Sequence, residues 1–205
     1  MIKILITGST GFLGNNLLNY LNSNISCEIY TINTKNSHQD GVKKNYLWNE
    51  IMKIEKMDLF IHLAGKSHDS NDIISKKQFF DINFKLTKTI YKKFLKSESS
   101  KFIFISSVKA VADSVKDVLT EKCNPNPITF YGKSKLLAER YLIKNMSKKK
   151  KLYILRPCMI HGPGNKGNLN QLFTLISKGI PWPLGSFNNK RSFCSIDNLL
   201  FVINE

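Results

Sequence analysis

Tyr131 and Lys135 lie four residues apart in the segment Tyr131-Gly132-Lys133-Ser134-Lys135, at the start of an expected helix. Residues four apart share one face of a helix, so the phenol and the ammonium can point into one site. A phenol with an ordinary pKa of about 10 is a poor base at neutral pH, but an adjacent ammonium favours the phenolate. The pair can therefore exchange a proton with a hydroxyl group. This spacing is common by chance in a lysine-rich chain, so only its position in the fold can indicate a catalytic pair.

Three glycines spaced three residues apart, Gly8, Gly11 and Gly14, lie between an expected strand, Ile2 to Thr7, and an expected amphipathic helix. Glycine permits a tight turn and lets backbone N–H groups approach a phosphate, and a helix N-terminus favours an anion. A plain strand-to-helix turn also uses glycine, but the position between these two elements favours a dinucleotide site. The predicted binding residues are Gly8, Ser9, Thr10, Gly11, Phe12, Leu13 and Gly14.

The rest of the chain alternates strand-like and helix-like segments. Short apolar runs predict strands, and longer segments with apolar residues at helical spacing predict helices. The expected strands are Ile2 to Thr7, Glu28 to Ile32, Asp58 to Leu63, Lys101 to Ser106 and Leu152 to Leu155. The expected helices run from about Phe12 to Asn22, Lys76 to Lys96 and Thr129 to Ser147. This alternation predicts an α/β fold, a Rossmann-type doubly wound parallel sheet with helices on both faces, which the chain leaves after Leu155.

These features together resemble the extended short-chain dehydrogenase/reductase family. The glycine spacing GxxGxxG matches that family, as does the YxxxK segment that follows the strand ending Phe104-Ile105-Ser106-Ser107. His62-Leu63-Ala64-Gly65 is similar to the family segment that lines the adenosine side of the cofactor. A histidine such as His62 is more often structural, and we assign it no catalytic role.

The resemblance implies a role for each matching residue. Ser107 matches the catalytic serine beside Tyr131, although the sequence leaves the neighbouring Ser106 as an alternative. Lys135 would also hold the nicotinamide ribose, and Ser107 would orient the substrate oxygen. The implied cofactor contacts beyond the glycine turn are Asn33, Lys35, Leu63, Ala64, Gly65, Asn83, Tyr131, Lys135 and Pro157.

The last third of the chain carries a closer resemblance. The segment from Leu155 to Gly164, LRPCMIHGPG, resembles the LRPxxVYGPG segment of nucleotide-sugar epimerases, dehydratases and reductases, with His161 in place of the usual Tyr. Ser106-Ser107-Val108-Lys109 and Lys178 to Gly185 are similar to a bacterial branch of UDP-glucose 4-epimerases and UDP-hexulose 4-reductases. The resemblance implies that an arginine holds the UDP diphosphate, and a guanidinium can bind phosphate oxygens bidentately. The implied substrate contacts are Ser107, Lys109, Asn168 and Arg191.

The implied activity is that of an NAD(P)-dependent oxidoreductase at C4 of a UDP-hexose, either a 4-keto reductase or a 4-epimerase. The second expected strand ends in Asn33 and Lys35, without the acidic residue that holds the ribose hydroxyls of NAD, so NADP(H) is slightly favoured. Weaker ribose contacts suit a cofactor that is exchanged in every cycle, which favours the reductase. Val108 and Lys109 stand where 4,6-dehydratases carry an acidic pair, which argues against dehydration.

Chains of this family are usually longer than these 205 residues. We therefore expect a dinucleotide-binding domain over residues 1–156 and an incomplete, apparently truncated substrate-binding lobe over residues 157–205. A function of another class is left open: a Rossmann module that binds a dinucleotide but is catalytically impaired, with a regulatory or RNA-associated role. The trio Ser107, Tyr131 and Lys135 favours the enzyme, and the short lobe favours the module.

Composition sets the remaining expectations. Four cysteines lie far apart without metal-ligand spacing, which predicts reduced thiols in a cytoplasmic protein and no metal site. The apolar runs are strand-sized and the first residues lack a signal-peptide pattern, so no membrane segment is expected. The net charge of +16 comes mostly from lysines, which predicts a solvated surface and no specific nucleic-acid partner. The oligomeric state is left open, with a homodimer as one alternative.

Overall fold

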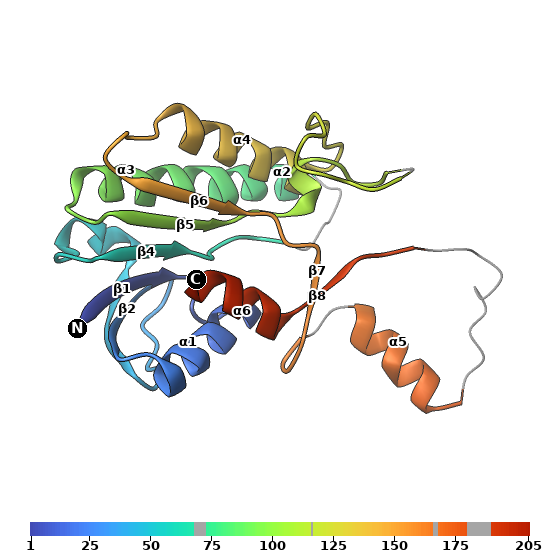
Figure 1. Ribbon diagram of the computed structural model, residues 1–205, viewed down its shortest axis with the longest axis horizontal. Helices are drawn as coiled ribbons and strands as arrows, with labels where there is room; N and C mark the ends of the chain where they lie inside the picture. Colours follow the sequence, from blue (N-terminus) through green and yellow to red (C-terminus); the bar gives the residue numbers. More distant parts are fainter. Residues whose placement is uncertain (68–72, 116, 166–167, 180–189) are drawn as a thin grey trace. The chain divides into compact units, whose positions relative to one another are not determined.

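The computed structural model describes residues 1–67, 73–115, 117–165, 168–179 and 190–205, and it divides into two compact units (Figure 1). The first unit is Met1–Pro157 and the second is Cys158–Glu205. This division falls one residue after Arg156, where the dinucleotide-binding domain is predicted to end. Among the described residues, no helix has the length and apolar character needed to cross a membrane.

A six-stranded parallel sheet forms the centre of the first unit. Its order is β3-β2-β1-β4-β5-β6, so the chain runs outward to one edge, returns to the middle and then runs outward to the other edge. The inner strands are runs of Ile, Leu and Phe, because a parallel sheet covered on both faces buries successive side chains. The predicted Rossmann-type sheet is confirmed. The strands are β1 Ile2–Thr7, β2 Cys27–Asn33, β3 Val42–Leu47, β4 Leu59–His62, β5 Lys101–Ile105 and β6 Lys151–Leu155.

Helices cover both faces of this sheet. α1 (Phe12–Asn24) lies on one face, and α3 (Thr87–Lys96) and α4 (Phe130–Lys144) lie side by side on the other (Figure 1). α2 (Ile73–Phe79) continues into α3 through a π-helical turn, Phe80–Leu86. The helix predicted from Lys76 to Lys96 is therefore helical throughout, but apolar spacing did not reveal the wider turn inside it.

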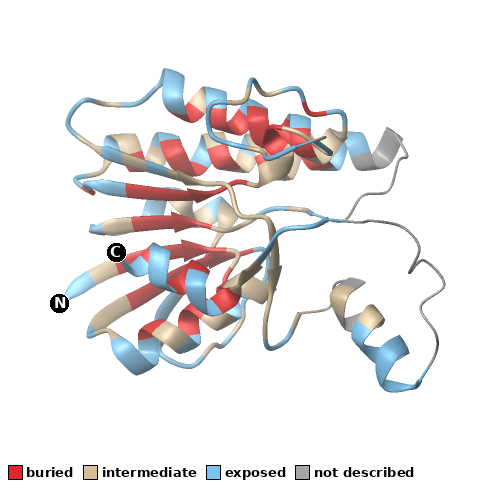
Figure 2. Ribbon diagram, turned by 45° about the vertical axis from the view of Figure 1, so that its right-hand side comes forward, coloured by how far each residue is buried: buried red, intermediate tan, exposed pale blue. Residues whose placement is uncertain are grey.

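The main apolar core lies between the sheet and the layer of α3 and α4, and Figure 2 shows buried residues along the strands and the inner sides of these helices. Aromatic rings dominate it. The ring centres of Tyr91 and Phe102 are 5.0 Å apart, and those of Phe60 and Phe94 are 5.6 Å apart. Edge and tilted ring contacts of this kind add to the burial of apolar surface. The core thereby sets the position of α3 and α4 over the strand ends that carry the predicted site.

Two parts of the structure go beyond the sequence predictions. β3 carries Lys43 and Lys44, which weaken an apolar pattern but suit a strand at the sheet edge, where charge discourages pairing with other chains. In the second unit, two short strands pair in parallel as a separate sheet, and Ser195 caps the last helix by accepting a bond from the Asn198 N–H (3.1 Å). The remaining elements are β7 Met159–His161, β8 Phe193–Ser195, α5 Asn168–Ser177, α6 Ile196–Asn204 and the 3₁₀ turns Trp48–Lys53 and Val108–Ala110.

Candidate active site

The predicted site residues of the first unit gather at the carboxyl ends of the strands. β1 ends before the glycine turn, β4 ends before Leu63, Ala64 and Gly65, and β5 ends before Ser106 and Ser107. β1 and β4 are neighbours in the sheet although two strands separate them along the chain. Doubly wound sheets bind ligands at such a switch point, beyond the carboxyl ends of the strands.

Two glycines of the turn, Gly8 and Gly14, have no room for a side chain. Gly8 has a φ of +73°, and a Cβ at this position would lie 2.7 Å from the backbone N and Cα of Ala64. A Cβ on Gly14 would collide with the carbonyl oxygen of Gly8. Gly11 is the N-cap of α1 and makes no side-chain cap bond, so the first N–H groups of α1 are open to an anion. The turn has the close backbone approach that a pyrophosphate requires. Of the other predicted turn residues, Ser9 is buried, Thr10 is exposed, and Phe12 and Leu13 are half-buried.

A cluster of neutral polar groups lies beside this turn. Asn33, at the end of β2, is 5% exposed, and its amide donates to Ser9 Oγ (3.0 Å) and Asn45 Oδ1 (2.8 Å). Gln39 donates from Nε2 to the Ser9 carbonyl oxygen (3.2 Å) and accepts from Ser9 Oγ (2.6 Å). Lys35 is exposed two residues beyond Asn33. These bonds join amides and hydroxyls, so the end of β2 presents neutral groups where NAD-specific sites carry an acid.

His62, at the end of β4, is fully buried and joins three elements. Thr7 Oγ1 accepts from the Ala64 N–H (3.2 Å) and lies 2.6 Å from His62 Nδ1, to which it donates when the ring proton is on Nε2. Thr87 Oγ1 donates to the Asn83 carbonyl (2.7 Å) and so accepts from His62 Nε2, 2.8 Å away. These bonds assign the neutral Nε2–H tautomer, and burial, followed by the charge of Lys135, lowers the pKa of His62 to about 3. His62 therefore ties β4 to β1 and α3, and neither of its ring nitrogens is exposed for catalysis.

Asn83 lies inside the π-helical turn and is fully buried. Its Oδ1 accepts from the Lys66 N–H (2.8 Å), and its Nδ2 donates to the Lys66 carbonyl (3.0 Å) and to Ser134 Oγ (2.9 Å). Single π-helical turns are frequent at functional sites. Asn83 therefore ties the segment after Gly65 to α4, and its amide is engaged within the protein.

Lys135 is 4% exposed, and its ammonium lies at the end of β5. It donates to the Ile105 carbonyl (2.8 Å) and lies 4.8 Å from the centre of the Phe104 ring. A Cβ on Gly65 would be 3.1 Å from its Nζ, so Gly65 keeps that side of the ammonium open. Burial lowers the pKa of Lys135 to about 8, against the opposing charge of Glu139. The site thus holds a cation whose charge is sensitive to its surroundings near neutral pH.

Tyr131 lies in the first turn of α4, and Gly132 lets that turn pack closely on the segment of residues 106–110, which carries Ser107. A Cβ on Gly132 would collide with the carbonyl oxygen of Lys109, so α4 begins in contact with the 3₁₀ turn that follows Ser107. Thr129 caps α4 by accepting from the Gly132 N–H (3.1 Å) and donates to Asp113 Oδ1 (2.7 Å). Tyr131 itself is half-buried, with its ring centre 6.2 Å from that of Phe79. The structure therefore brings together the segments that carry Ser107, Tyr131 and Lys135.

The two neighbouring serines differ in exposure. Ser106 is 3% exposed, and within the described residues its hydroxyl has no hydrogen-bond partner. Ser107 is half-buried, and its Oγ accepts from the Lys109 N–H (3.2 Å). Because a substrate must reach the hydroxyl, this difference favours Ser107 over Ser106 as the serine that contacts substrate.

The remaining predicted residues lie around this edge or in the second unit. Lys109 is half-buried in the 3₁₀ turn, and the Pro157 carbonyl accepts from the Val108 N–H (3.2 Å). Asn168 begins α5, but its side chain is outside the described part of the structure. Arg191 is exposed just before β8 in the second unit. In the described ranges, no three His, Cys, Asp or Glu side chains gather as a metal site would require.

Sequence reasoning missed the residues that hold the site in place, notably Gln39, Asp113 and Glu139. Gln39 and Asp113 lie in loops, and their partners are 30 and 16 residues away along the chain, so no local spacing indicates them. Glu139 did carry a signal, because it follows Lys135 by four residues and therefore shares its helix face.

Comparison with known proteins places this site in a family context. Residues 4–203 match the model described as the NAD dependent epimerase/dehydratase family. The chain is 33% identical over 218 residues to the UDP-glucose 4-epimerase of Vibrio cholerae, covering 98% of this chain and 65% of that protein. It is 27% identical over 217 residues to the N-acetyl-alpha-D-glucosaminyl-diphospho-ditrans,octacis-undecaprenol 4-epimerase of Escherichia coli O157:H7, covering 98% of this chain and 62% of that protein. The chain thus spans just under two thirds of the length of these relatives.

Solved structures share the fold. MoeE5 in complex with UDP-glucuronic acid and NAD superposes with a TM-score of 0.84 at 18% identity, covering 98% of this chain and 71% of that one. The UDP-N-acetylglucosamine 4-epimerase from Bacillus cereus superposes with a TM-score of 0.78 at 22% identity, covering 100% of this chain and 72% of that one. At these identities the likeness extends to the fold alone.

Proposed function

Since the chain belongs to the NAD dependent epimerase/dehydratase family, we propose that it oxidises and reduces C4 of a UDP-sugar with a nicotinamide dinucleotide as cofactor. The observation that carries the proposal is the buried ammonium of Lys135, held at the end of β5 on the helix that also carries Tyr131. A cation in that position is needed to make a phenol act as a base near neutral pH. The substrate class comes from the relatives, two of which are named as 4-epimerases of sugar nucleotides or sugar diphospholipids.

The residues at the carboxyl edge of the sheet fit a dinucleotide. Gly8 and Gly14 keep side chains out of the turn, and the uncapped start of α1 suits a pyrophosphate. When bound, the dinucleotide supplies the acceptor and donor of the hydride. The end of β2 carries the neutral Asn33 in place of an acid, and Lys35 has an exposed ammonium two residues later, so we propose that NADP(H) binds at least as well as NAD(H).

Three side chains of this chain carry the proton chemistry in the proposal. Tyr131 takes the proton from the C4 hydroxyl as the carbon is oxidised and returns it when the carbon is reduced. Lys135 favours the phenolate through its charge. Ser107 donates a hydrogen bond to the substrate oxygen and orients it.

Of the two reactions at C4, we place 4-epimerisation first because both relatives described above are 4-epimerases by name. The 4-keto reductase, which the sequence alone favours, is the second candidate. The specific observation in its favour is the neutral Asn33 at the end of β2. An epimerase must hold its cofactor through oxidation, rotation of the sugar and return of the hydride. A reductase releases its cofactor in each cycle, and the weaker ribose contacts of a neutral residue suit that release.

The test uses the purified chain. It is incubated with UDP-glucose, UDP-galactose or their N-acetyl forms without added reductant, and separately with a UDP-4-keto sugar and NAD(P)H. Interconversion of epimers without net NAD(P)H consumption supports the epimerase, and stoichiometric consumption supports the reductase. Tyr131→Phe should slow either reaction by about 100-fold or more. Tyr153→Phe, which removes a phenol that is 42% exposed on β6, should not slow either reaction. Dinucleotide binding without turnover of any of these sugars would overturn the proposal and favour the binding module.

A further inference from the structure

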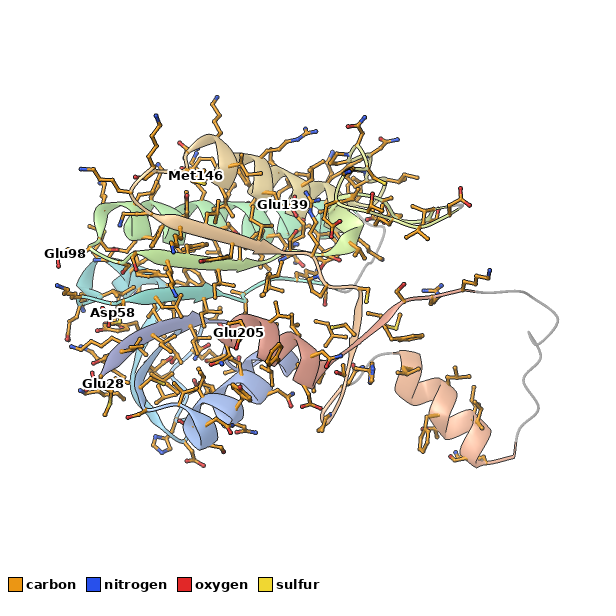
Figure 3. The ribbon with its side chains drawn as sticks, in the orientation of Figure 1. Glu28, Asp58, Glu98, Glu139, Met146 and Glu205 are labelled. Atoms are coloured by element: carbon orange, nitrogen blue, oxygen red, sulfur yellow. The ribbon has the colours of Figure 1, made fainter. Side chains whose placement is uncertain are left out.

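Glu139 is a buried carboxylate one helical turn beyond Lys135 on α4, and it is labelled in Figure 3. It is 1% exposed. Arg156, which follows β6, donates from Nε to Oε1 (3.0 Å) and to Oε2 (3.2 Å), and from Nη2 to Oε2 (2.6 Å). A forked arrangement of this kind is the strong form of a charge-assisted hydrogen bond. The carboxylate is therefore fixed in place and charged.

The backbone on both sides of Arg156 holds the serine segment. The Leu155 carbonyl accepts from the Ser106 N–H (2.7 Å), and the Pro157 carbonyl accepts from the Val108 N–H (3.2 Å). Ser107 lies between these two donors. The ion pair between Glu139 and Arg156 therefore connects α4, which carries Tyr131 and Lys135, to the backbone that carries Ser107.

Among the described groups around Lys135, Glu139 is the one that carries an opposite charge. On the side of β5, the ammonium donates to the Ile105 carbonyl and lies over the Phe104 ring, and both of these groups are uncharged. From β4 it faces His62, which is neutral, and from α4 it shares a helix face with Tyr131 and Glu139. Arg156 is ion-paired with Glu139, and Lys135 lies one helical turn from the same carboxylate on α4.

We propose that Glu139 is a positioning residue, which keeps Lys135 charged in a dry site and, through Arg156, holds α4 against the segment of Ser107. The proposal rests on the proposed function, because it assigns Lys135 its role beside Tyr131. It goes beyond a packing role, since a purely structural ion pair would affect stability without changing how activity depends on pH.

The expected size follows from the charge of Lys135. Burial holds its pKa at about 8, and Glu139 is the charge that opposes this lowering. Glu139→Gln should lower the pKa of Lys135 further, and a change of about one unit, the low end for an opposite charge nearby, sets the scale of the effect. At about pH 7.5 the charged fraction would then fall from about three quarters to about one quarter, roughly a threefold loss. At about pH 6.5 the ammonium is mostly charged in both proteins, and most of the loss should disappear.

The experiment measures kcat against pH for the wild type, Glu139→Gln, Glu139→Asp and Arg156→Met, with thermal unfolding of each. Glu139→Gln is expected to move the alkaline limb of the profile to lower pH. Glu139→Asp keeps the negative charge, so the alkaline limb should stay at the pH of the wild type. Arg156→Met removes the ion-pair partner of Glu139, so the alkaline limb should stay in place or move to higher pH. A structural ion pair would instead make Glu139→Gln and Arg156→Met behave alike. An unmoved alkaline limb in Glu139→Gln would overturn the proposal.

A second readout separates this proposal from the proposed function. The phenolate absorbance of Tyr131 is measured without substrate. It is the absorbance of the wild type minus that of Tyr131→Phe, and the absorbance of Glu139→Gln minus that of the double variant with Tyr131→Phe. Phenolate formation is expected at higher pH in Glu139→Gln than in the wild type. If the wild type turns over no sugar but this shift is seen, the proposed function fails and the electrostatic role of Glu139 holds. If turnover is seen without either shift, the role of Glu139 fails alone.

Discussion

Replacing His62 by Gln should make the stability of the first unit less sensitive to acid. The folded protein holds His62 neutral with a pKa of about 3, whereas an exposed histidine titrates at 6.5. Below pH 6.5 the unfolded chain therefore binds a proton that the folded chain refuses, so the free energy of unfolding falls as the pH falls from 6.5 towards 3. At about pH 5 the cost from this one group is about 2 kcal/mol, and it is close to zero at about pH 7.5.

The assay is urea unfolding, monitored by tryptophan fluorescence at several pH values between about 5 and about 7.5. Gln cannot reproduce both bonds, to Thr7 and to Thr87, so the variant should be less stable at about pH 7.5 by about 1–2 kcal/mol. Its further loss on acidification should be about 2 kcal/mol smaller than that of the wild type, because the other titrating groups are common to both. His38→Gln, at an exposed histidine, is the matched control. Parallel pH dependence of the wild type and His62→Gln would refute the reasoning.

Three further outcomes are expected at the site. Tyr131→Phe should lower kcat by about 100-fold or more and leave dinucleotide affinity nearly unchanged by calorimetry, because the hydroxyl moves protons and lies on α4, away from the glycine turn; substantial turnover would sink the assignment. Asn33→Asp should weaken NADPH relative to NADH by about tenfold through repulsion of the 2′-phosphate, and an unchanged ratio in competition titrations would count against the ribose position. Gly14→Ala should lower both the melting temperature and dinucleotide affinity, since its methyl group meets the Gly8 carbonyl; a variant that binds as tightly as the wild type would contradict the close packing of the turn.

The sequence predicted the parts of the fold that local pattern controls. β1, β2, β4, β5 and β6 are apolar runs that a parallel sheet buries, and each was predicted to within a residue or two at either end. β3 was missed because an edge strand tolerates Lys43 and Lys44, so its pattern is polar. The π-helical turn was missed because apolar spacing describes a helix on average and not the one extra residue in a turn.

The same distinction applies to the site. The glycine turn and the pair of Tyr131 and Lys135 depend on spacing along the chain, and the structure brings their segments to one edge of the sheet. His62 bonds to Thr7 and Thr87, which are 55 and 25 positions away along the chain. Arg156, the partner of Glu139, is 17 positions away. Contacts of that range depend on how the elements pack, which periodicity does not encode.

The strand order also has a consequence for how the chain reaches its native state. β1 lies in the middle of the sheet, yet its partner on one side is β4, and contacts such as Thr7 with His62 close a separation of 55 residues. Until β4 has been synthesised or has folded into place, one edge of β1, with its buried residues Ile4, Leu5 and Ile6, is unpaired. Long-range parallel pairing pays its loop-closure entropy before the contacts form, so we expect refolding slower than that of helical bundles of similar size. Refolding that is complete within the dead time of a stopped-flow mixer would contradict this. A nascent chain that lacks β4 would expose one edge of β1, so aggregation is a hazard in the interval between the synthesis of β1 and that of β4.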